Sequence, residues 1–144
     1  MTIIVDIDNT LCSSKERFDF ATNESGKIDW DIAHSFDNMI KDKPNPPMID
    51  LVKRYKKDDI QIIIITGRPD FTKEVTELWL EKYNIPYDKL YMRSKEDHYI
   101  KANILKKKIY ETHITDKIFC AYDDDDSIIE MWGDLGIPCF KVYV

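Results

Sequence analysis

The chain has 144 residues, of which 43% are hydrophobic, 12% aromatic and 33% charged, and its formal net charge is -6. This length suits one compact domain with a full hydrophobic core, and a content of only 4 Gly and 6 Pro argues against long disordered segments. The mildly acidic charge argues against a broad electrostatic grip on duplex nucleic acid, although recognition of a nucleic-acid end needs only a few cationic side chains.

Cysteine usage and hydropathy favour a cytoplasmic protein. Cys12, Cys120 and Cys139 are odd in number and far apart, so neither a disulfide framework nor a zinc site is expected. Cys120 lies in an apolar run and is predicted to be buried. The chain begins directly with a strand pattern, without the features of a signal peptide, and no apolar run approaches the ~18 residues of a membrane span. We therefore expect no contact with a membrane.

Short apolar runs predict β-strands at residues 2–6, 60–66, 90–92, 117–122 and 138–144. The first, second and fourth runs are continuous rather than alternating, which is typical of strands that are buried on both faces of a parallel sheet. Each of these runs also ends at polar residues that could carry chemistry.

Helical spacing of apolar residues predicts helices at residues 46–57, 71–83 and 99–110, and Asp126 could cap a further short helix that closes at Gly136. Strands that alternate with helices predict an α/β fold. We expect a doubly wound, Rossmann-like parallel sheet of about five strands with helices on both faces. Reactive groups in such folds gather beyond the carboxyl ends of the strands.

Residues 13–45 do not follow this alternation, because they are mostly polar. Residues 23–26 have the composition of a turn, and a short amphipathic piece lies at residues 30–40. We expect this segment to be a small lid, inserted after the first strand of a single domain that spans residues 1–144.

Asp6, Asp8 and Thr10 form a DxDxT pattern where the first strand ends. Alternation along an extended chain directs the two aspartates to the same side, where they repel each other unless a cation or a shared proton compensates. Mg²⁺ prefers oxygen ligands and would meet this need. A strand end with an aspartate turn and a threonine cap would give the same pattern.

Thr66, Gly67 and Arg68 stand at the end of the second predicted strand of this kind. A threonine hydroxyl and the next backbone N–H can bind phosphate oxygens, Gly67 allows a close backbone approach, and the guanidinium of Arg68 fits a phosphate. A strand followed by Thr-Gly is also a common way for a chain to leave a sheet.

Asp97 and Lys101 are four residues apart on a predicted helix. By themselves they fit an exposed helical ion pair. The lysines at 106, 107 and 108 are expected to form a solvated face.

Four consecutive aspartates, Asp123 to Asp126, follow the strand predicted at residues 117–122. Asp123 and Asp124 lie nearest the strand end and are the better candidates for metal ligands, whereas Asp126 fits a helix cap. A solvated acidic turn is the alternative interpretation.

The order of these elements resembles the four motifs of the haloacid dehalogenase (HAD) superfamily over the whole chain. More narrowly, VDIDNTL, ITGR and YDDDDSIIEMWGDLGIPCF resemble the 3′-phosphatase domain of the phage polynucleotide kinase/phosphatase family, as do Arg17 and the Asp97–Lys101 pair. Asn9 replaces the usual glycine of the first motif. The spacing from Lys101 to Asp123 is slightly long, which leaves open whether Lys101 or a neighbouring lysine fills the role of the third motif. No GxxxxGK[ST] kinase motif is present.

The resemblance implies a Mg²⁺-dependent phosphomonoesterase in which Asp6 is the nucleophile and forms an aspartyl-phosphate. Asp8 would be the general acid and then the general base. The metal ligands would be Asp6, Asp8 (through its backbone carbonyl), Asp123 and Asp124.

The resemblance also implies that Thr66 and Lys101 hold the transferring phosphate and that Asp97 orients Lys101. The remaining substrate-binding residues would be Thr10, Arg17, Gly67 and Arg68.

The resemblance favours a 3′-phosphorylated nucleic-acid end, DNA or RNA, as the substrate. The acidic charge and small size leave a mononucleotide phosphatase as the alternative. Trp30, His34 and Phe36 could stack on a base or could form the core of the lid. A phospho-acceptor signalling module is disfavoured, because receiver domains place their acid pair before the phosphorylated aspartate. No protein partner is indicated.

Overall fold

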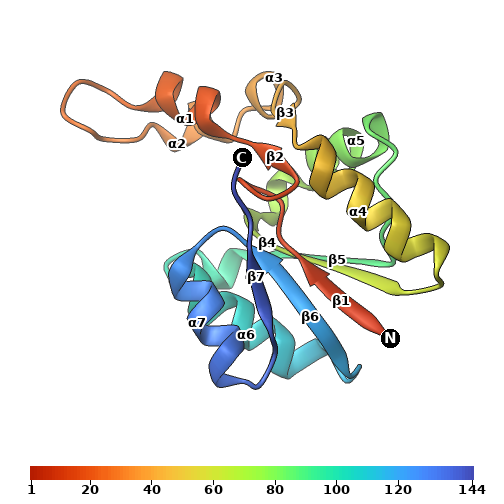
Figure 1. Cartoon of the computed structure of the whole chain (residues 1–144). Coiled ribbons are helices and arrows are strands. Elements are labelled where there is room, and N and C mark those ends of the chain that lie inside the picture. The colour runs from red at the N-terminus through yellow and green to blue at the C-terminus, as the bar shows by residue number, and fades with distance from the viewer.

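The computed structural model describes residues 1–144 and contains a sheet of five parallel strands in the order β5-β4-β1-β6-β7 (Figure 1). The strands of this sheet are β1 (Thr2–Val5), β4 (Gln61–Pro69), β5 (Lys89–Arg93), β6 (Ile118–Asp123) and β7 (Cys139–Lys141). The predicted α/β class, with a parallel sheet at its centre, is therefore confirmed.

Helices pack on both faces of this sheet (Figure 1). The helices are α1 (Lys15–Ala21), α2 (Trp30–Ala33), α3 (Phe36–Met39), α4 (Pro46–Lys57), α5 (Lys73–Lys82), α6 (Ala102–His113) and α7 (Asp126–Asp134), with single 3₁₀ turns at Asp70–Thr72 and Lys95–Asp97. None of the helices combines the length and the apolar character that a membrane crossing needs.

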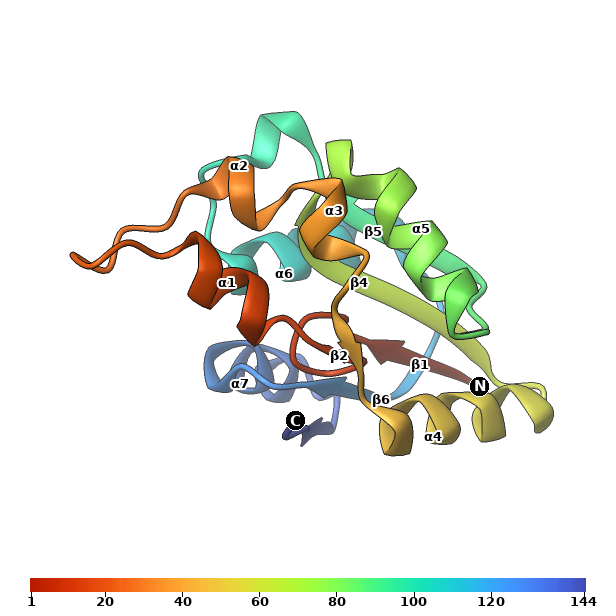
Figure 2. The same ribbon diagram turned by 90° about the horizontal axis from the view of Figure 1, so that it is seen from above.

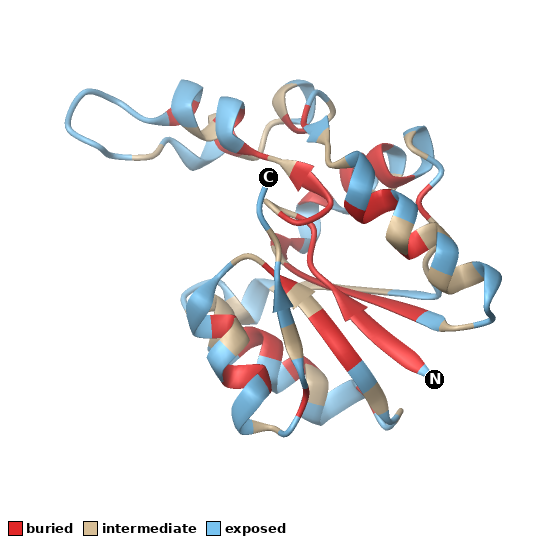
Figure 3. Ribbon diagram, viewed as in Figure 1, coloured by how far each residue is buried: buried red, intermediate tan, exposed pale blue.

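The strands alternate their side chains between two hydrophobic cores, which is why the runs are apolar without interruption. Ile3 and Val5 pack with residues of α4 and α5 on one face of the sheet. Ile4 packs with residues of α6 and α7 on the other face. Strand β1, at the centre of the sheet, is buried along its length, as Figure 3 shows in red. The rigid sheet fixes the positions of the loops that follow β1, β4 and β6.

The segment 13–45, called the lid below, folds over the edge of the sheet where β1 ends (Figure 2). A two-stranded antiparallel ladder of β2 (Cys12–Ser13) and β3 (Lys43–Pro44) closes its base. Helices α1, α2 and α3 lie between these two strands, and an isolated bridge between Thr22 and Ile28 makes a hairpin after α1. The amphipathic piece predicted at 30–40 is therefore two one-turn helices.

Two elements differ from the predicted boundaries in ways that matter for the site. Strand β4 continues through Pro69, so Thr66, Gly67 and Arg68 lie within the strand and do not follow it. Helix α6 begins at Ala102, three residues later than predicted, because Arg93 donates hydrogen bonds to the carbonyls of Asp97 and Ile100. These bonds hold residues 94–101 outside the helix.

Candidate active site

Asp6 follows β1 directly and is only 6% exposed. Its carboxylate accepts a hydrogen bond from the Thr10 hydroxyl at 3.0 Å and one from the Lys106 ammonium at 2.8 Å. The same ammonium donates to Asp123 at 2.6 Å, at the end of β6. One lysine therefore bridges two carboxylates that come from adjacent strands.

Asp123 is buried, and the turn that follows β6 is built around its carboxylate. Oδ1 of Asp123 accepts from the backbone N–H of Asp124 at 2.9 Å and of Asp125 at 3.2 Å. Asp125, and not Asp126, caps α7, because its side chain accepts from the Ser127 N–H at 2.8 Å. Asp126 instead forms an ion pair with Lys141.

Carboxylate oxygens of Asp6, Asp123 and Asp124 lie within 4.8 Å of one another. Burial, together with the charge of Asp123, raises the pKa of Asp6 to about 7, although Lys106 opposes the shift. Burial and the charge of Asp6 raise the pKa of Asp124 to about 6. The group, called the Asp6 cluster below, thus holds more negative charge than its single lysine balances.

These three carboxylates suit a divalent cation. Hard oxygen ligands, close spacing and an excess of negative charge are what Mg²⁺ requires of a protein site. The carboxylate of Asp8 is not part of this group, so only its backbone carbonyl could serve a metal held here.

Asp8 belongs to a second group, in which two guanidinium groups hold two carboxylates. Arg68 donates from Nε and Nη2 to the two oxygens of Asp8 at 3.0 and 2.8 Å, and Arg17 donates from Nη2 at 2.6 Å. Both arginines also donate to the buried Asp42, at 3.0 Å. We call these residues the Asp8 cluster. Asp42 is a site residue that the sequence analysis did not single out.

The protonation of Asp8 follows from this arrangement. Burial alone would raise the pKa of the Asp8 carboxyl, but Arg68 and then Arg17 hold this pKa well below its usual range. Burial, opposed by the same arginines, raises the pKa of Asp42. The Asp8 cluster contains equal numbers of positive and negative groups, so it needs no further cation.

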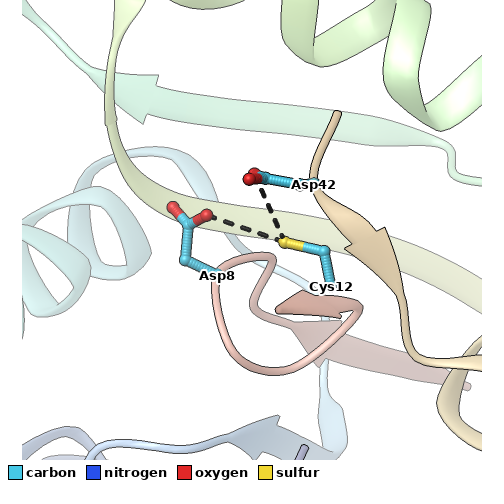
Figure 4. A group of neighbouring side chains, drawn as sticks. All are labelled: Asp8, Cys12 and Asp42. Atoms are coloured by element: carbon cyan, nitrogen blue, oxygen red, sulfur yellow. Dashed lines mark hydrogen bonds between the residues drawn. The ribbon is translucent and has the colours of Figure 1, made fainter. Parts of the chain in front are cut away.

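Cys12 lies between the carboxylates of the Asp8 cluster (Figure 4). Its thiol is 3.7 Å from Asp8 and 3.8 Å from Asp42, and burial raises its pKa well above the usual value. These three side chains are close enough to hold a metal ion. They do not fit one, because the guanidinium groups of Arg17 and Arg68 already occupy the same carboxylate oxygens.

The TGR segment lies on strand β4, which pairs with β1, and its Arg68 belongs to the Asp8 cluster. Thr66 is fully buried, and its hydroxyl accepts from the Arg68 N–H at 3.2 Å. A side chain at Gly67 would meet only Arg93 and Ala102, at 3.8 and 4.0 Å, so the protein by itself leaves room there. The sequence analysis expected Thr66 and Arg68 at the same edge of the sheet as Asp8, and in the structure Arg68 contacts both Asp8 and Thr66.

Lys101 does not reach this site. It is exposed and precedes α6 as its N-cap residue, whereas the buried Lys106, on α6, contacts Asp6 and Asp123. The expectation that Lys106 forms a solvated face is therefore wrong. The spacing from Lys101 to Asp123 was long for the family pattern, and this was the available signal for Lys106.

Asp97 does not orient Lys101 either. Its carboxylate accepts from the Ser94 hydroxyl at 3.0 Å and from Lys108 at 2.5 Å. These contacts, with those of Arg93, order the turn before α6. Asp97 therefore lies outside both clusters.

Asn9 replaces the usual glycine of the first motif without distorting the loop. Its backbone has a φ of 60°, in the left-handed region that asparagine tolerates better than most side chains. Its side-chain oxygen accepts from the N–H of Ser14 at 3.2 Å and from the Ser14 hydroxyl at 3.3 Å. The departure from the motif thus adds a link to the lid.

Comparison with known proteins gives, over the whole chain, the family that the sequence motifs resemble. The family model of the polynucleotide kinase PNKP phosphatase domain matches residues 1–144. A protein of Autographa californica nuclear polyhedrosis virus, named for polynucleotide kinase and RNA ligase activities, is 33% identical over 110 residues, which are 73% of this chain and 16% of that protein.

Two further relatives are similar to most of this chain. A chain in the structure of the Pnkp1/Rnl/Hen1 complex has a TM-score of 0.78 and 32% identity, over 98% of this chain and 45% of that chain. Membrane-associated phosphatidylinositol transfer protein 3 of Mus musculus is 30% identical over 121 residues, which are 81% of this chain and 12% of that protein. The chain spans less than half the length of each of these relatives.

The motif order, the two clusters at the carboxyl ends of β1, β4 and β6, and the family match over residues 1–144 agree with one another. The chain belongs to the polynucleotide kinase phosphatase-domain family of HAD phosphatases.

Proposed function

We propose that this phosphatase removes the 3′-phosphate from nucleic-acid ends, with Mg²⁺ as its cofactor and an aspartyl-phosphate on Asp6 as the intermediate. The observation that carries the chemistry is the Asp6 cluster, in which a buried carboxylate at a strand end lies beside a lysine and two further acids. The family match over the whole chain carries the choice of substrate.

The first step forms a bond between a carboxylate oxygen of Asp6 and phosphorus and breaks the bond from phosphorus to the 3′-oxygen. The leaving oxygen takes a proton from Asp8. In the structure Asp8 is held ionised by Arg17 and Arg68. Asp8 can therefore act as an acid only if the arriving anionic substrate draws the two guanidinium groups away from it.

The second step is hydrolysis of the aspartyl-phosphate. Water attacks phosphorus, its proton passes to Asp8, and the bond to Asp6 breaks. The products are inorganic phosphate and a 3′-hydroxyl end. The ionised state of Asp8 in the structure is the one this step needs.

The charged groups around Asp6 fit the binding of a phosphoryl group. Lys106 would donate to the transferring oxygens in place of the predicted Lys101, and Thr66 would donate from its hydroxyl. Arg17 and Arg68 would bind the phosphate or the adjoining sugar–phosphate. Thr10 fixes the orientation of Asp6.

Asp6, Asp123 and Asp124 would hold Mg²⁺, together with the backbone carbonyl of Asp8. The ion would offset the charge of both the nucleophile and the phosphate, which otherwise repel each other.

The test is phosphate release with Mg²⁺ from a 3′-phosphorylated oligonucleotide, its 5′-phosphorylated isomer, and 3′- and 5′-mononucleotides. We expect the 3′-phosphorylated oligonucleotide to be preferred. The control is Asp6→Asn, which keeps the size of the side chain and removes the nucleophile. It should retain less than roughly 1% of the activity.

Preference for mononucleotides would reject the nucleic-acid substrate and keep the chemistry. Substantial turnover by Asp6→Asn, with an unchanged thermal unfolding curve, would reject Asp6 as the nucleophile. Activity that survives removal of divalent cations by a chelator would reject the cofactor.

A further inference from the structure

A row of aromatic rings runs from the lid to the loop after β4. Phe18 contacts Trp30 edge to face at 5.9 Å between ring centroids, Trp30 lies 5.3 Å from His34, and His34 lies 6.0 Å from Phe71. Phe71 belongs to the 3₁₀ turn between β4 and α5, whereas the other three rings belong to the lid. The row therefore connects the lid with the turn after β4, and these two segments flank the site.

Two rings of this row, those of Trp30 and Phe71, are exposed, whereas Phe18 and His34 are half-buried. Trp30 is 55% exposed and Phe71 is 71% exposed, whereas Trp79 and Trp132 are fully buried in the two cores. The lid buries other side chains to hold itself on the sheet, namely Ala33 and Met39. The ring of Trp30 is thus not needed as the core of the lid, and Phe71 lies outside the lid.

The row is joined directly to the Asp8 cluster. Arg17 donates from Nη2 to Asp8 and from Nη1 to the carbonyl of Ala33, the residue before His34. The guanidinium group of Arg17 also lies 4.7 Å from the ring centroid of Phe18. A single guanidinium therefore separates the carboxylate of Asp8 from the helix that carries Trp30.

His34 contributes an uncharged ring to the row. Burial, followed by the positive charge of Arg17, lowers its pKa to about 4. The imidazole is therefore neutral at pH 7, and it packs against Trp30 at an angle of 35° between the ring planes. Neutral rings present flat apolar faces, which stack on nucleobases of any sequence.

We propose that Trp30, His34 and Phe71 form a stacking site for the base of the terminal nucleotide whose 3′-phosphate enters the Asp6 cluster. This inference rests on the proposed function, and it names single-stranded ends as the substrate class, because a paired and stacked base could not lie on these rings. The net charge of -6 argues against a broad electrostatic grip on a duplex, whereas stacking on aromatic rings can hold a single strand without it.

The test compares two single-stranded oligonucleotides that differ only at the 3′-phosphorylated end, one with adenine on the terminal sugar and one with an abasic sugar. For the unsubstituted protein we expect kcat/KM to favour the base-bearing end by about tenfold, the size of a typical stacking contribution. Trp30→Ala should reduce this preference to near one, and Trp30→Phe should keep most of it. Phe36→Ala removes another exposed lid ring, outside the row, and should keep all of it.

The ratio of the two rates separates stacking from damage to the lid, because a misplaced lid slows both substrates alike. If Trp30→Ala keeps the preference, or if the unsubstituted protein has none, the stacking site is rejected while the 3′-phosphatase stands. If neither oligonucleotide releases phosphate but ring-free glycerol 2-phosphate does, the proposed substrate and the stacking site are both rejected.

Tryptophan fluorescence gives an independent measurement, because Trp30 is the one exposed tryptophan of three. The inactive Asp6→Asn variant should show quenching when titrated with the base-bearing oligonucleotide and much less with the abasic one. Combining it with Trp30→Phe should remove the quenching. Equal quenching by both oligonucleotides would contradict the stacking site.

Discussion

The Asp6 cluster and the Asp8 cluster lie side by side at the edge of one sheet, but they differ in the balance of positive and negative groups. The Asp6 cluster has three carboxylates around one ammonium group, whereas the Asp8 cluster has two carboxylates and two guanidinium groups. The pKa of Asp6 is accordingly raised, and that of Asp8 is lowered. Two aspartates only two residues apart therefore enter the reaction with opposite proton affinities.

Because of this difference in charge, the two clusters are suited to different ligands. An excess of negative charge favours a cation at the Asp6 cluster, and the balanced Asp8 cluster can bind an anion only by giving up an internal ion pair. Pairs of carboxyl groups with divergent pKa values are typical of acid–base sites. The following predictions test this contrast between the two clusters.

Lys106→Met should have the largest effect, because it leaves Asp6 and Asp123 buried without their counter-ion. We expect activity to fall by about a hundredfold or more and the metal-free protein to lose about 3–5 kcal/mol of stability. Lys101→Met is the matched control on an exposed lysine, and it should change activity by less than about twofold. Steady-state kinetics and urea unfolding would measure both, and equal losses in the two variants would contradict the assignment of Lys106.

Asp42→Asn should unbalance the Asp8 cluster while keeping the shape of the side chain. Arg17 and Arg68 would lose the charge that anchors them, so we expect kcat/KM to fall by about ten- to a hundredfold and stability by about 2–3 kcal/mol. Asp50→Asn, on the exposed face of α4, is the control. An unchanged kcat/KM in Asp42→Asn would show that the arginines need no anchor.

The pH dependence of the metal-free protein should reveal the raised pKa of Asp6. Between the ordinary pKa of about 4 and the folded value of about 7, the folded protein binds more protons than the unfolded chain, so its contribution to stability falls as the pH rises. We expect a loss of about 1–3 kcal/mol across this window, which Asp6→Asn should reduce, while the raised pKa of Asp124 keeps part of it.

Mg²⁺ should reverse this pH trend, because a bound cation favours the ionised carboxylate. Urea unfolding between pH 5 and 8, with and without the metal, would measure the effect. Suppose that, without metal, the free energy of unfolding rises with pH equally in the unsubstituted protein and in Asp6→Asn. This result would contradict the excess of negative charge at Asp6.

Asp125→Ala should have the smallest effect, since this residue caps α7 and lies outside the Asp6 cluster. Loss of the cap should cost about 1 kcal/mol of stability. Asp126→Ala breaks only an exposed ion pair with Lys141 and should cost less than about 0.5 kcal/mol. Thermal unfolding compares the two, and the reverse order would restore Asp126 as the cap.

The sequence determined the fold, because the spacing of apolar residues in each segment shows whether that segment forms a strand or a helix. Continuous apolar runs marked β1, β4 and β6, and a helical pattern at residues 46–57 coincides with the bounds of α4. It also placed Asp6, Asp8, Thr66 and Asp123 at one edge, because parallel strands end on the same side of a sheet.

The tertiary structure alone decided which partners these residues have. Lys106 reads in the sequence as one of three adjacent lysines, and its partners Asp6 and Asp123 come from the ends of two other strands, 100 and 17 residues away along the chain. Asp42 stands in a polar segment without any motif, and it meets Arg17 only when the lid closes its β2–β3 base. Periodicity specifies the faces of single elements, whereas the pairing of charges depends on how separate elements meet in space, which the local pattern does not record.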